Sequence, residues 1–248
     1  MTALSLELAG RACAEYFRMQ AVGLEHVPAE GGALLVANHS GVLPFDTLLI
    51  MDALRRRHPA PRTVHNIADE LLFSWPGVGA WARATGRFWP MDSAVAKHLL
   101  RSGELLLVYP EGIRGLGKLY ADRYQVQDFG RGGFAAVAMA AEVPIVPISV
   151  VGAEDFYRML ADCPPLARLL RLPYFPVTPV FPWLGPAGLI PFPARVTIRF
   201  GAPIRVPAAR NGTLESYRSG VETVAARTRE AVQAGLDARD LSTAMSGN

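Results

Sequence analysis

The sequence predicts an α/β protein, a single domain with a mixed, mostly parallel sheet flanked by helices. Two observations lead to this prediction. Short apolar runs such as 104-ELLLVYP-110 recur along the chain and are typical of buried strands. They alternate with longer segments that have the spacing and polarity of helices, which favours a parallel sheet. The chain has 248 residues, enough for one large domain.

The individual elements are predicted in chain order from these patterns. Residues 3–19 place Leu8 and Phe17 roughly on one side and predict an amphipathic helix. Pro44 suits the first turn of a helix that runs from Asp46 to about residue 57. A short strand and a turn are expected at 21–28, and strands at 32–38, 62–68, 104–110, 143–152 and 194–201. Further helices are expected at 92–102, 131–141 and 213–235.

The segment 163–193 interrupts this alternation. It contains nine prolines, which we expect to exclude a regular helix or a central strand, and it is rich in Leu, Phe, Trp and Tyr. One interpretation is a loop packed over the domain by its own aromatic side chains. The other is a surface that enters a membrane interface or lines an acyl channel. The predicted organisation is an N-terminal helix (1–20), a domain (21–238) that includes this insertion, and a flexible tail (239–248).

Composition and charge argue against several classes of protein. The net charge is only +3, too small to indicate nucleic-acid binding. The two cysteines, Cys13 and Cys163, form no metal-binding pattern and fit a reducing compartment. No run reaches the roughly 18 to 20 apolar residues of a membrane span, and the first residues lack the basic head of a signal peptide. We therefore expect a cytoplasmic protein without a metal or nucleic-acid partner.

Candidate catalytic residues lie in the stretch 36-VANHSGVLPFDTLLI-50. His39 follows an apolar strand, and ligands of open α/β sheets gather at the carboxyl ends of strands. Asp46 would lie in the first turn of the next helix, from which its carboxylate can reach the imidazole. Such a contact fixes the tautomer and makes the other ring nitrogen a better base. The alternative is a helix-start aspartate near a strand-end histidine, without any chemistry.

A second polar cluster follows another strand, in 107-LVYPEGIRGLGK-118. Glu111, Gly112 and Arg114 stand at the end of that strand, which should face the same side as His39. The carboxylate and the guanidinium could hold a hydroxyl and an anion there. Taken by itself, the cluster is more typical of an ordinary turn with a solvated charge pair.

Four ordered blocks resemble the glycerolipid (lysophospholipid) acyltransferase superfamily, which includes 1-acylglycerol-3-phosphate acyltransferases. The family pattern consists of NHxxxxD, a G-x-[IV]-[FP]-like block, a [FV]-P-E-G-T-R-S-like block and V-P-[IV]-[VI]-P. This chain carries 38-NHSGVLPFD-46, 86-GRFWPMD-92, 108-VYPEGIRG-115 and 143-VPIVP-147. The resemblance covers roughly residues 20 to 205 and implies a glycerol-3-phosphate acyltransferase-like fold.

The resemblance implies an O-acyltransferase of glycerolipid synthesis. It would move a fatty acyl group from acyl-CoA or acyl carrier protein to a lipid hydroxyl, of a lysophospholipid or an acylglycerol, with no further cofactor. By analogy His39 is the general base and Asp46 orients it. The substrate-binding residues would be Glu111, Gly112, Arg114 and Arg87. A lipid acceptor also implies a protein peripheral to the membrane, on its inner face. Backbone N–H groups near Gly41 or Gly112 are candidates for stabilising the oxyanion.

Three of the blocks depart from the family pattern. Six residues separate His39 from Asp46, where the family has four. The second block lacks the final arginine of the family, and the nearest arginine is Arg87. In the third block Ile113 replaces Thr and Gly115 replaces Ser, which removes two hydroxyl donors. Fewer phosphate-binding groups favour a neutral or bulkier acceptor, such as a mono- or diacylglycerol.

Other functions remain as alternatives. A serine hydrolase acting on acyl esters or thioesters would need a G-x-S-x-G nucleophile elbow, and the sequence contains none, although water could still replace the alcohol in an acyltransferase site. A non-catalytic lipid- or CoA-binding module would not need the two polar clusters together. The glycine run 129-FGRGGF-134 follows no apolar strand and is a weak indication of a nucleotide site. The cluster 55-RRRH-58 fits CoA phosphates, anionic lipid or a solvated helix end.

Overall fold

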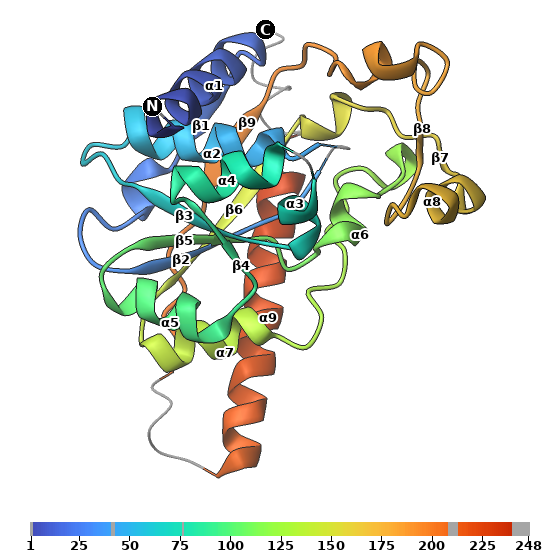
Figure 1. Ribbon diagram of the computed structural model, residues 1–248. Helices are drawn as coiled ribbons and strands as arrows, with labels where there is room; N and C mark the ends of the chain where they lie inside the picture. The colour runs from blue at the N-terminus through green and yellow to red at the C-terminus, as the bar shows by residue number, and fades with distance from the viewer. Residues whose placement is uncertain (1, 41–42, 76, 208–212, 240–248) are drawn as a thin grey trace, which may run out of the picture.

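The structure is a computed structural model that describes residues 2–40, 43–75, 77–207 and 213–239. Its central strands are β1 (Gln20–Val22), β2 (Ala33–Ala37), β3 (Val64–Ala68), β4 (Phe88–Pro90), β5 (Leu105–Val108), β6 (Ile145–Val151) and β9 (Thr197–Phe200). They form one seven-stranded sheet in the order β1-β9-β6-β2-β5-β3-β4 (Figure 1). Neighbouring strands are parallel except β6 and β9. The prediction of a mixed, mostly parallel sheet flanked by helices is confirmed.

Helices cover both faces of this sheet. They are α1 (Thr2–Tyr16), α2 (Phe45–Arg56), α3 (Glu70–Ser74), α4 (Val78–Thr85), α5 (Ser93–Arg101), α6 (Ile113–Leu116), α7 (Gly133–Ala141), α8 (Pro164–Leu170) and α9 (Leu214–Asp237). Figure 1 shows α1, α2 and α4 above the sheet and α5 and α7 below it, with α9 packed beside α7. The sheet is therefore the middle of three layers.

The strand β2 runs through the centre of the core. Leu35 packs in one apolar cluster with Phe17, which follows α1, and with Leu49 of α2. Leu34 points to the opposite face, where it shares a cluster with Leu100 of α5. Because successive side chains of a strand alternate between faces, and both faces are covered by helices, all five residues of β2 are apolar and buried.

The register of the sheet brings several strand ends to one edge. Leu35 of β2 pairs with Leu107 of β5, and Leu107 also pairs with Asn66 of β3. Parallel strands in this register end at the same edge of the sheet. His39, just after β2, and Glu111, just after β5, therefore lie near each other, as the sequence predicts.

The insertion 163–193 contains more regular structure than we expect from its prolines. The helix α8 begins at Pro164 and has proline in its first turn. The expectation that prolines exclude a regular helix is wrong here, since the missing N–H of a first-turn proline would have no helical partner anyway. The insertion also contributes β8 (Pro176–Val177), which pairs with β7 (Ala161–Asp162) in a separate ribbon, and the 3-10 turn η4 (Gly185–Leu189).

The elements between 69 and 92 have no counterpart in the sequence prediction. Here α3 has 5 residues and β4 has 3, too few to show a helical or strand period. Residues 240–248 of the predicted flexible tail lie outside the described residues. Among the residues that are described, none of the helices has the length and apolar character needed to cross a bilayer.

His65 on β3 provides a test of how burial couples to stability. Its side chain is mostly buried, and Nδ1 accepts the indole N–H of Trp89 at 2.9 Å. Burial, followed by the nearby charge of Arg87, lowers the pKa of His65 from 6.5. Below that pH the unfolded chain binds a proton that the folded protein resists, so the free energy of unfolding should fall as the solution is acidified.

We predict that His65→Gln will flatten this acid-side loss of stability. The glutamine can still accept the Trp89 N–H, but it does not titrate. Urea unfolding between pH 5 and 8 should give a smaller change for the variant than for the wild type. His98→Gln, at an exposed position of α5, serves as the control. Equal pH dependence of the wild type and His65→Gln would contradict the prediction.

Candidate active site

The end of β2 is fastened to β6 by the buried side chain of Asn38. Backbone pairing of the two strands reaches Ala37 and Ile148. Beyond it, Nδ2 of Asn38 donates to the carbonyl of Val150 at 3.1 Å, and Oδ1 accepts the Val150 N–H at 2.7 Å. The side-chain amide thus binds both the carbonyl and the N–H of Val150, as a neighbouring strand backbone would. This anchor fixes the point from which the next residue, His39, projects.

Asp46 brings its carboxylate directly to the His39 ring. Oδ2 of Asp46 lies 2.7 Å from Nδ1 of His39 and also accepts the Ser40 N–H at 3.3 Å. Oδ1 accepts the Thr47 N–H at 2.8 Å. The carboxylate is fully buried in the first turn of α2, where the helix dipole favours a negative charge. A separation of six residues therefore allows the two side chains to meet.

This contact gives the two imidazole nitrogens of His39 different roles. A carboxylate accepts a hydrogen bond, so Nδ1 carries the proton and Nε2 keeps its lone pair. The side chain is 9% exposed, which shields it from bulk water while leaving some access. Gly41, a predicted source of an oxyanion-stabilising N–H, lies outside the described residues.

Tyr109 lies flat against the His39 ring. The ring centroids are 3.9 Å apart and the planes differ by 18°. The phenol oxygen is 2.9 Å from Oγ1 of Thr47, whose N–H binds Asp46. Burial, then the charge of Asp46, raises the pKa of Tyr109 well above 10.0, so the phenol stays neutral. Tyr109 and Asp46 therefore hold the imidazole from two sides, and Thr47 hydrogen-bonds to both of them.

Glu111 binds the backbone of the site with both carboxylate oxygens. Oε1 accepts the His39 N–H at 2.9 Å, and Oε2 accepts the Gln127 N–H at 2.8 Å. The residue is 3% exposed. Its geometry is that of a group that holds the His39 backbone in place. Direct contact of Glu111 with substrate stays a prediction.

The glycines around α6 are required for two different reasons. Gly112 has φ 54° and ψ −140°, a conformation that favours glycine, and a Cβ there would meet nothing within 4 Å. A Cβ on Gly115 would lie 2.9 Å from both Cβ and the carbonyl oxygen of His39. The missing side chain lets α6 pack closely on His39. Arg114 of α6 is exposed beside this contact, so its guanidinium is available to a ligand.

Arg87 does not share this edge of the sheet. It precedes β4, and Phe88 is level with Asn66 of β3. Through the register of the parallel strands, Arg87 and His39 are separated by about 16 Å along the strand direction alone. Nη1 of Arg87 lies 3.4 Å from Nε2 of His65. The structure thus places Arg87 apart from the other predicted substrate-binding residues, because it lies at the start of its strand and His39 lies beyond the end of another.

The space beside Arg87 is a cavity of about 200 Å³ between α1, α2 and the start of β3. Arg55 and Arg56 of the cationic cluster line this cavity, where they pair with Glu7 and Asp52. Two of the three arginines of 55-RRRH-58 are thus paired with carboxylates of the protein itself.

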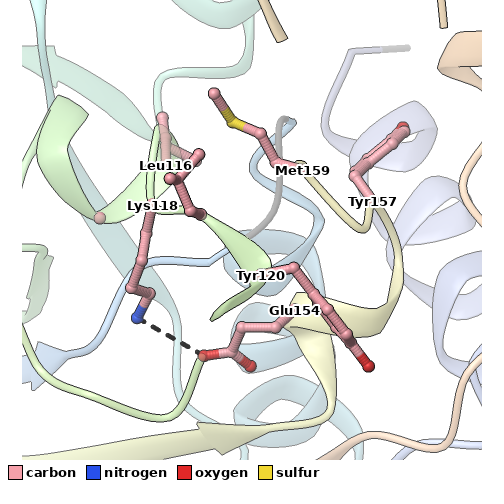
Figure 2. A pocket seen from close by; sticks show the side chains of 8 residues that line it. Leu116, Lys118, Tyr120, Glu154, Tyr157 and Met159 are labelled. Carbon is pink, nitrogen blue, oxygen red and sulfur yellow. Dashed lines mark ion pairs between the residues drawn. The ribbon is translucent and has the colours of Figure 1, made fainter. Parts of the chain in front are cut away.

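A small pocket behind α6 contains a buried ion pair (Figure 2). Nζ of Lys118 lies 3.6 Å from Oε1 of Glu154, and the two side chains are 3% and 5% exposed. Burial raises the pKa of the Glu154 carboxyl, and the Lys118 charge opposes that shift. Among the described residues, Oε2 of Glu154 has no hydrogen-bond partner. The pocket, about 10 Å³, has room for one water molecule there.

Sequence reasoning did not single out Asn38, Tyr109 or Thr47 as site residues. Asn38 precedes His39, and Tyr109 lies in the third block. Both follow predicted strands, and this position could have indicated that they belong to the site. Thr47 carried none, because only the packing of α2 against the end of β5 brings it to the phenol of Tyr109.

Comparison with known proteins identifies the family to which this chain belongs. The model of the Acyltransferase family matches residues 18–151, more than half of the chain. This chain therefore belongs to the Acyltransferase family. The match includes the His39–Asp46 contact and the Glu111 cluster.

Among individual relatives, an uncharacterized protein of Mycobacterium tuberculosis is 49% identical over 189 residues, which are 76% of this chain and 52% of that protein. A Gallus gallus protein named "DGAT1/2-independent enzyme synthesizing storage lipids" is 31% identical over 214 residues, 86% of this chain and 57% of that protein. The chain thus spans about half the length of the curated relatives it matches.

A solved structure shares the fold. It is the 1-acyl-sn-glycerophosphate (LPA) acyltransferase PlsC from Thermotoga maritima, with a TM-score of 0.58 and 20% identity. The match covers 94% of this chain and 80% of that one. It confirms the acyltransferase-like fold that the four blocks imply.

Proposed function

We propose that this protein transfers a fatty acyl group from acyl-CoA or acyl carrier protein to the hydroxyl of a lipid acceptor. The observation that carries this proposal is the buried His39–Asp46 hydrogen bond, 2.7 Å long, at the carboxyl edge of the sheet in a chain of the Acyltransferase family. It supplies an oriented base, and a thioester is already activated toward an alcohol. No covalent acyl-enzyme is required.

In the proposed reaction, Nε2 of His39 accepts the proton of the acceptor hydroxyl as its oxygen attacks the thioester carbonyl carbon. The Asp46 carboxylate stabilises the imidazolium that forms, through Nδ1–H. When the tetrahedral intermediate collapses, the carbon–sulfur bond breaks and the imidazolium returns its proton to the thiolate. The products are an ester and a free thiol, and His39 is regenerated.

We further propose a neutral acceptor, such as a mono- or diacylglycerol. The site has Ile113 and Gly115 where the family pattern has hydroxyl residues, and Arg87 lies elsewhere in the fold. Arg114 remains as an exposed cation for a phosphate of the acyl donor. The name of the Gallus gallus relative, which refers to storage lipids, is in keeping with a neutral acceptor.

The test is release of free thiol from a long-chain acyl donor, offered as the CoA or the carrier-protein thioester. Acceptors would include monoacylglycerol, diacylglycerol, lysophosphatidic acid and water alone. We expect release to depend on the acceptor and to be faster with an acylglycerol. A strong preference for lysophosphatidic acid would overturn the neutral acceptor, whereas fatty acid release without any acceptor would indicate a hydrolase instead.

Tyr109 should contribute to this reaction through its ring more than through its hydroxyl. Tyr109→Phe keeps the stack on His39 and should reduce kcat by no more than about threefold, while Tyr109→Leu removes the stack and should reduce it by about tenfold. The comparison of kcat at saturating acceptor, with melting temperatures as a control, checks this. If Phe and Leu are equally damaging, the hydroxyl contact to Thr47 is the important one.

A further inference from the structure

The insertion exposes an unusual concentration of large apolar side chains. Of the 16 such side chains that are exposed among the described residues, 7 fall within residues 163–193. They are Leu166, Leu169, Leu170, Trp183, Leu184, Ile190 and Phe192. Trp183 is 73% exposed and Leu169 is 76% exposed. Scattered apolar residues are normal on a surface, but a concentration of this kind indicates a binding surface.

The charge of the same segment has one sign. Residues 163–193 contain no Asp or Glu, and their only charged side chains are Arg168 and Arg171. Both arginines are exposed, at and just after the end of α8. On that helix they stand among exposed leucines, while Ala167 alone is buried. Apolar side chains mixed with arginine, and an exposed tryptophan, match a bilayer surface that carries anionic headgroups.

The segment is held firmly although its side chains point outward. The Tyr157 hydroxyl donates to the Leu189 carbonyl at 2.6 Å, and the Phe192 N–H donates to the Phe156 carbonyl at 3.0 Å. The Tyr16 hydroxyl of α1 donates to the Pro191 carbonyl at 2.8 Å. These bonds anchor the backbone of residues 189–192, on which Ile190 and Phe192 are exposed.

The insertion also lies beside the candidate active site. A Cβ on Gly117 would be 3.3 Å from the ring of Tyr174, so the insertion packs on the loop that follows α6. Gly115, on the same α6, packs against His39. Figure 1 shows α6 next to α8 and the β7–β8 ribbon. The insertion is therefore a neighbour of the edge of the sheet where His39 lies.

We propose that the insertion 163–193 docks the protein onto a bilayer that contains anionic lipid. Trp183, Leu184 and Leu169 enter the interface, and Arg168 and Arg171 contact the headgroups. Docking of this kind presents the His39 edge to lipid in the membrane. The delivery of an acceptor to His39 rests on the proposed function, whereas the docking itself does not.

The first experiment measures binding of the full chain to vesicles, without catalysis. Vesicles of phosphatidylcholine alone are compared with vesicles in which part of it is replaced by phosphatidylglycerol, by co-sedimentation at two salt concentrations. We expect binding to increase with the anionic fraction and to weaken with salt. Absence of binding to either vesicle would overturn the proposal and leave the surface to a protein partner.

Two pairs of variants identify the segment. Trp183→Ser with Leu184→Ser, and Arg168→Glu with Arg171→Glu, should each weaken vesicle binding at least tenfold. Matched controls lie on α9, far from the insertion in Figure 1, and should bind like the wild type. They are Leu214→Ser, which changes a residue 67% exposed, and Arg218→Glu with Arg227→Glu. Wild-type binding by both insertion variants would overturn the proposal.

Fluorescence and activity separate docking from catalysis. Trp183→Phe should abolish most of the blue shift in tryptophan fluorescence that vesicles cause, although Trp75, Trp81 and Trp89 remain.

Activity gives a separate test. With a short-chain acceptor in solution, the insertion variants should keep the wild-type rate of thiol release. A loss of rate as large as the one seen with vesicle-bound acceptor would overturn the docking role. If the wild type binds vesicles but transfers no acyl group to any acceptor, the proposed function fails while the docking stands.

Discussion

Replacing His39 with alanine should reduce acceptor-dependent thiol release by about 10²- to 10⁴-fold, the usual contribution of a general base. The imidazole is the group at this edge that combines a free lone pair with an orienting carboxylate, 2.7 Å away. Without it, the acceptor hydroxyl must lose its proton to water. Substrate affinity should change little, because the base acts on the hydroxyl during bond formation.

Asp46→Asn should be nearly as damaging, for a different reason. The carboxylate accepts hydrogen bonds from Nδ1 of His39 and from the N–H groups of Ser40 and Thr47. An asparagine that keeps its oxygen on Thr47 turns its NH₂ toward Nδ1. Nε2 then carries the ring proton and cannot act as the base, so kcat should fall about 10²-fold or more.

The measurement for both variants is the rate of thiol release at saturating acceptor, with the melting temperature as a check of folding. His98→Ala on α5 is the matched control, since this exposed histidine lies on the opposite layer of the fold. It should retain the wild-type rate. A His39→Ala protein that folds and keeps full activity would show that the proton goes elsewhere.

Glu111→Gln should impair both stability and turnover. In the wild type, both carboxylate oxygens accept backbone N–H groups, from His39 and Gln127. Glutamine keeps one acceptor and turns an NH₂ toward the second N–H, which leaves two buried donors facing each other. We expect a loss of about 1 to 3 kcal/mol in the free energy of unfolding. Turnover should fall as well, because the brace that Glu111 forms between the backbones of His39 and Gln127 is broken.

Urea unfolding and steady-state kinetics together distinguish the two possible roles of Glu111. A residue that holds the His39 backbone lowers stability and kcat when changed. A residue that only binds acceptor raises KM and leaves unfolding unaltered, which would contradict the prediction. Glu222→Gln, at an exposed position of α9, is the control and should change neither quantity.

Local patterns in the sequence were sufficient for the class of fold and for the strands that matter most. Apolar runs predict β2, β5 and β6 within a few residues of their observed bounds, because a strand covered on both faces has no polar positions. The order of strand ends and helix starts also placed His39 and Asp46 where they can meet. The short elements between 69 and 92 escaped prediction, since they are too brief to show a period.

The sequence by itself therefore determined a mostly parallel α/β sheet with a histidine and a carboxylate at its carboxyl edge. Only the tertiary structure decided that Glu111 holds the His39 backbone, that Tyr109 stacks on the imidazole, and that Arg87 lies away from both. The physical reason is that periodicity and capping act between residues close in sequence. Strand register and the packing of layers instead bring together residues far apart in the chain. They decide which backbone groups Glu111 binds and how far Arg87 lies from His39.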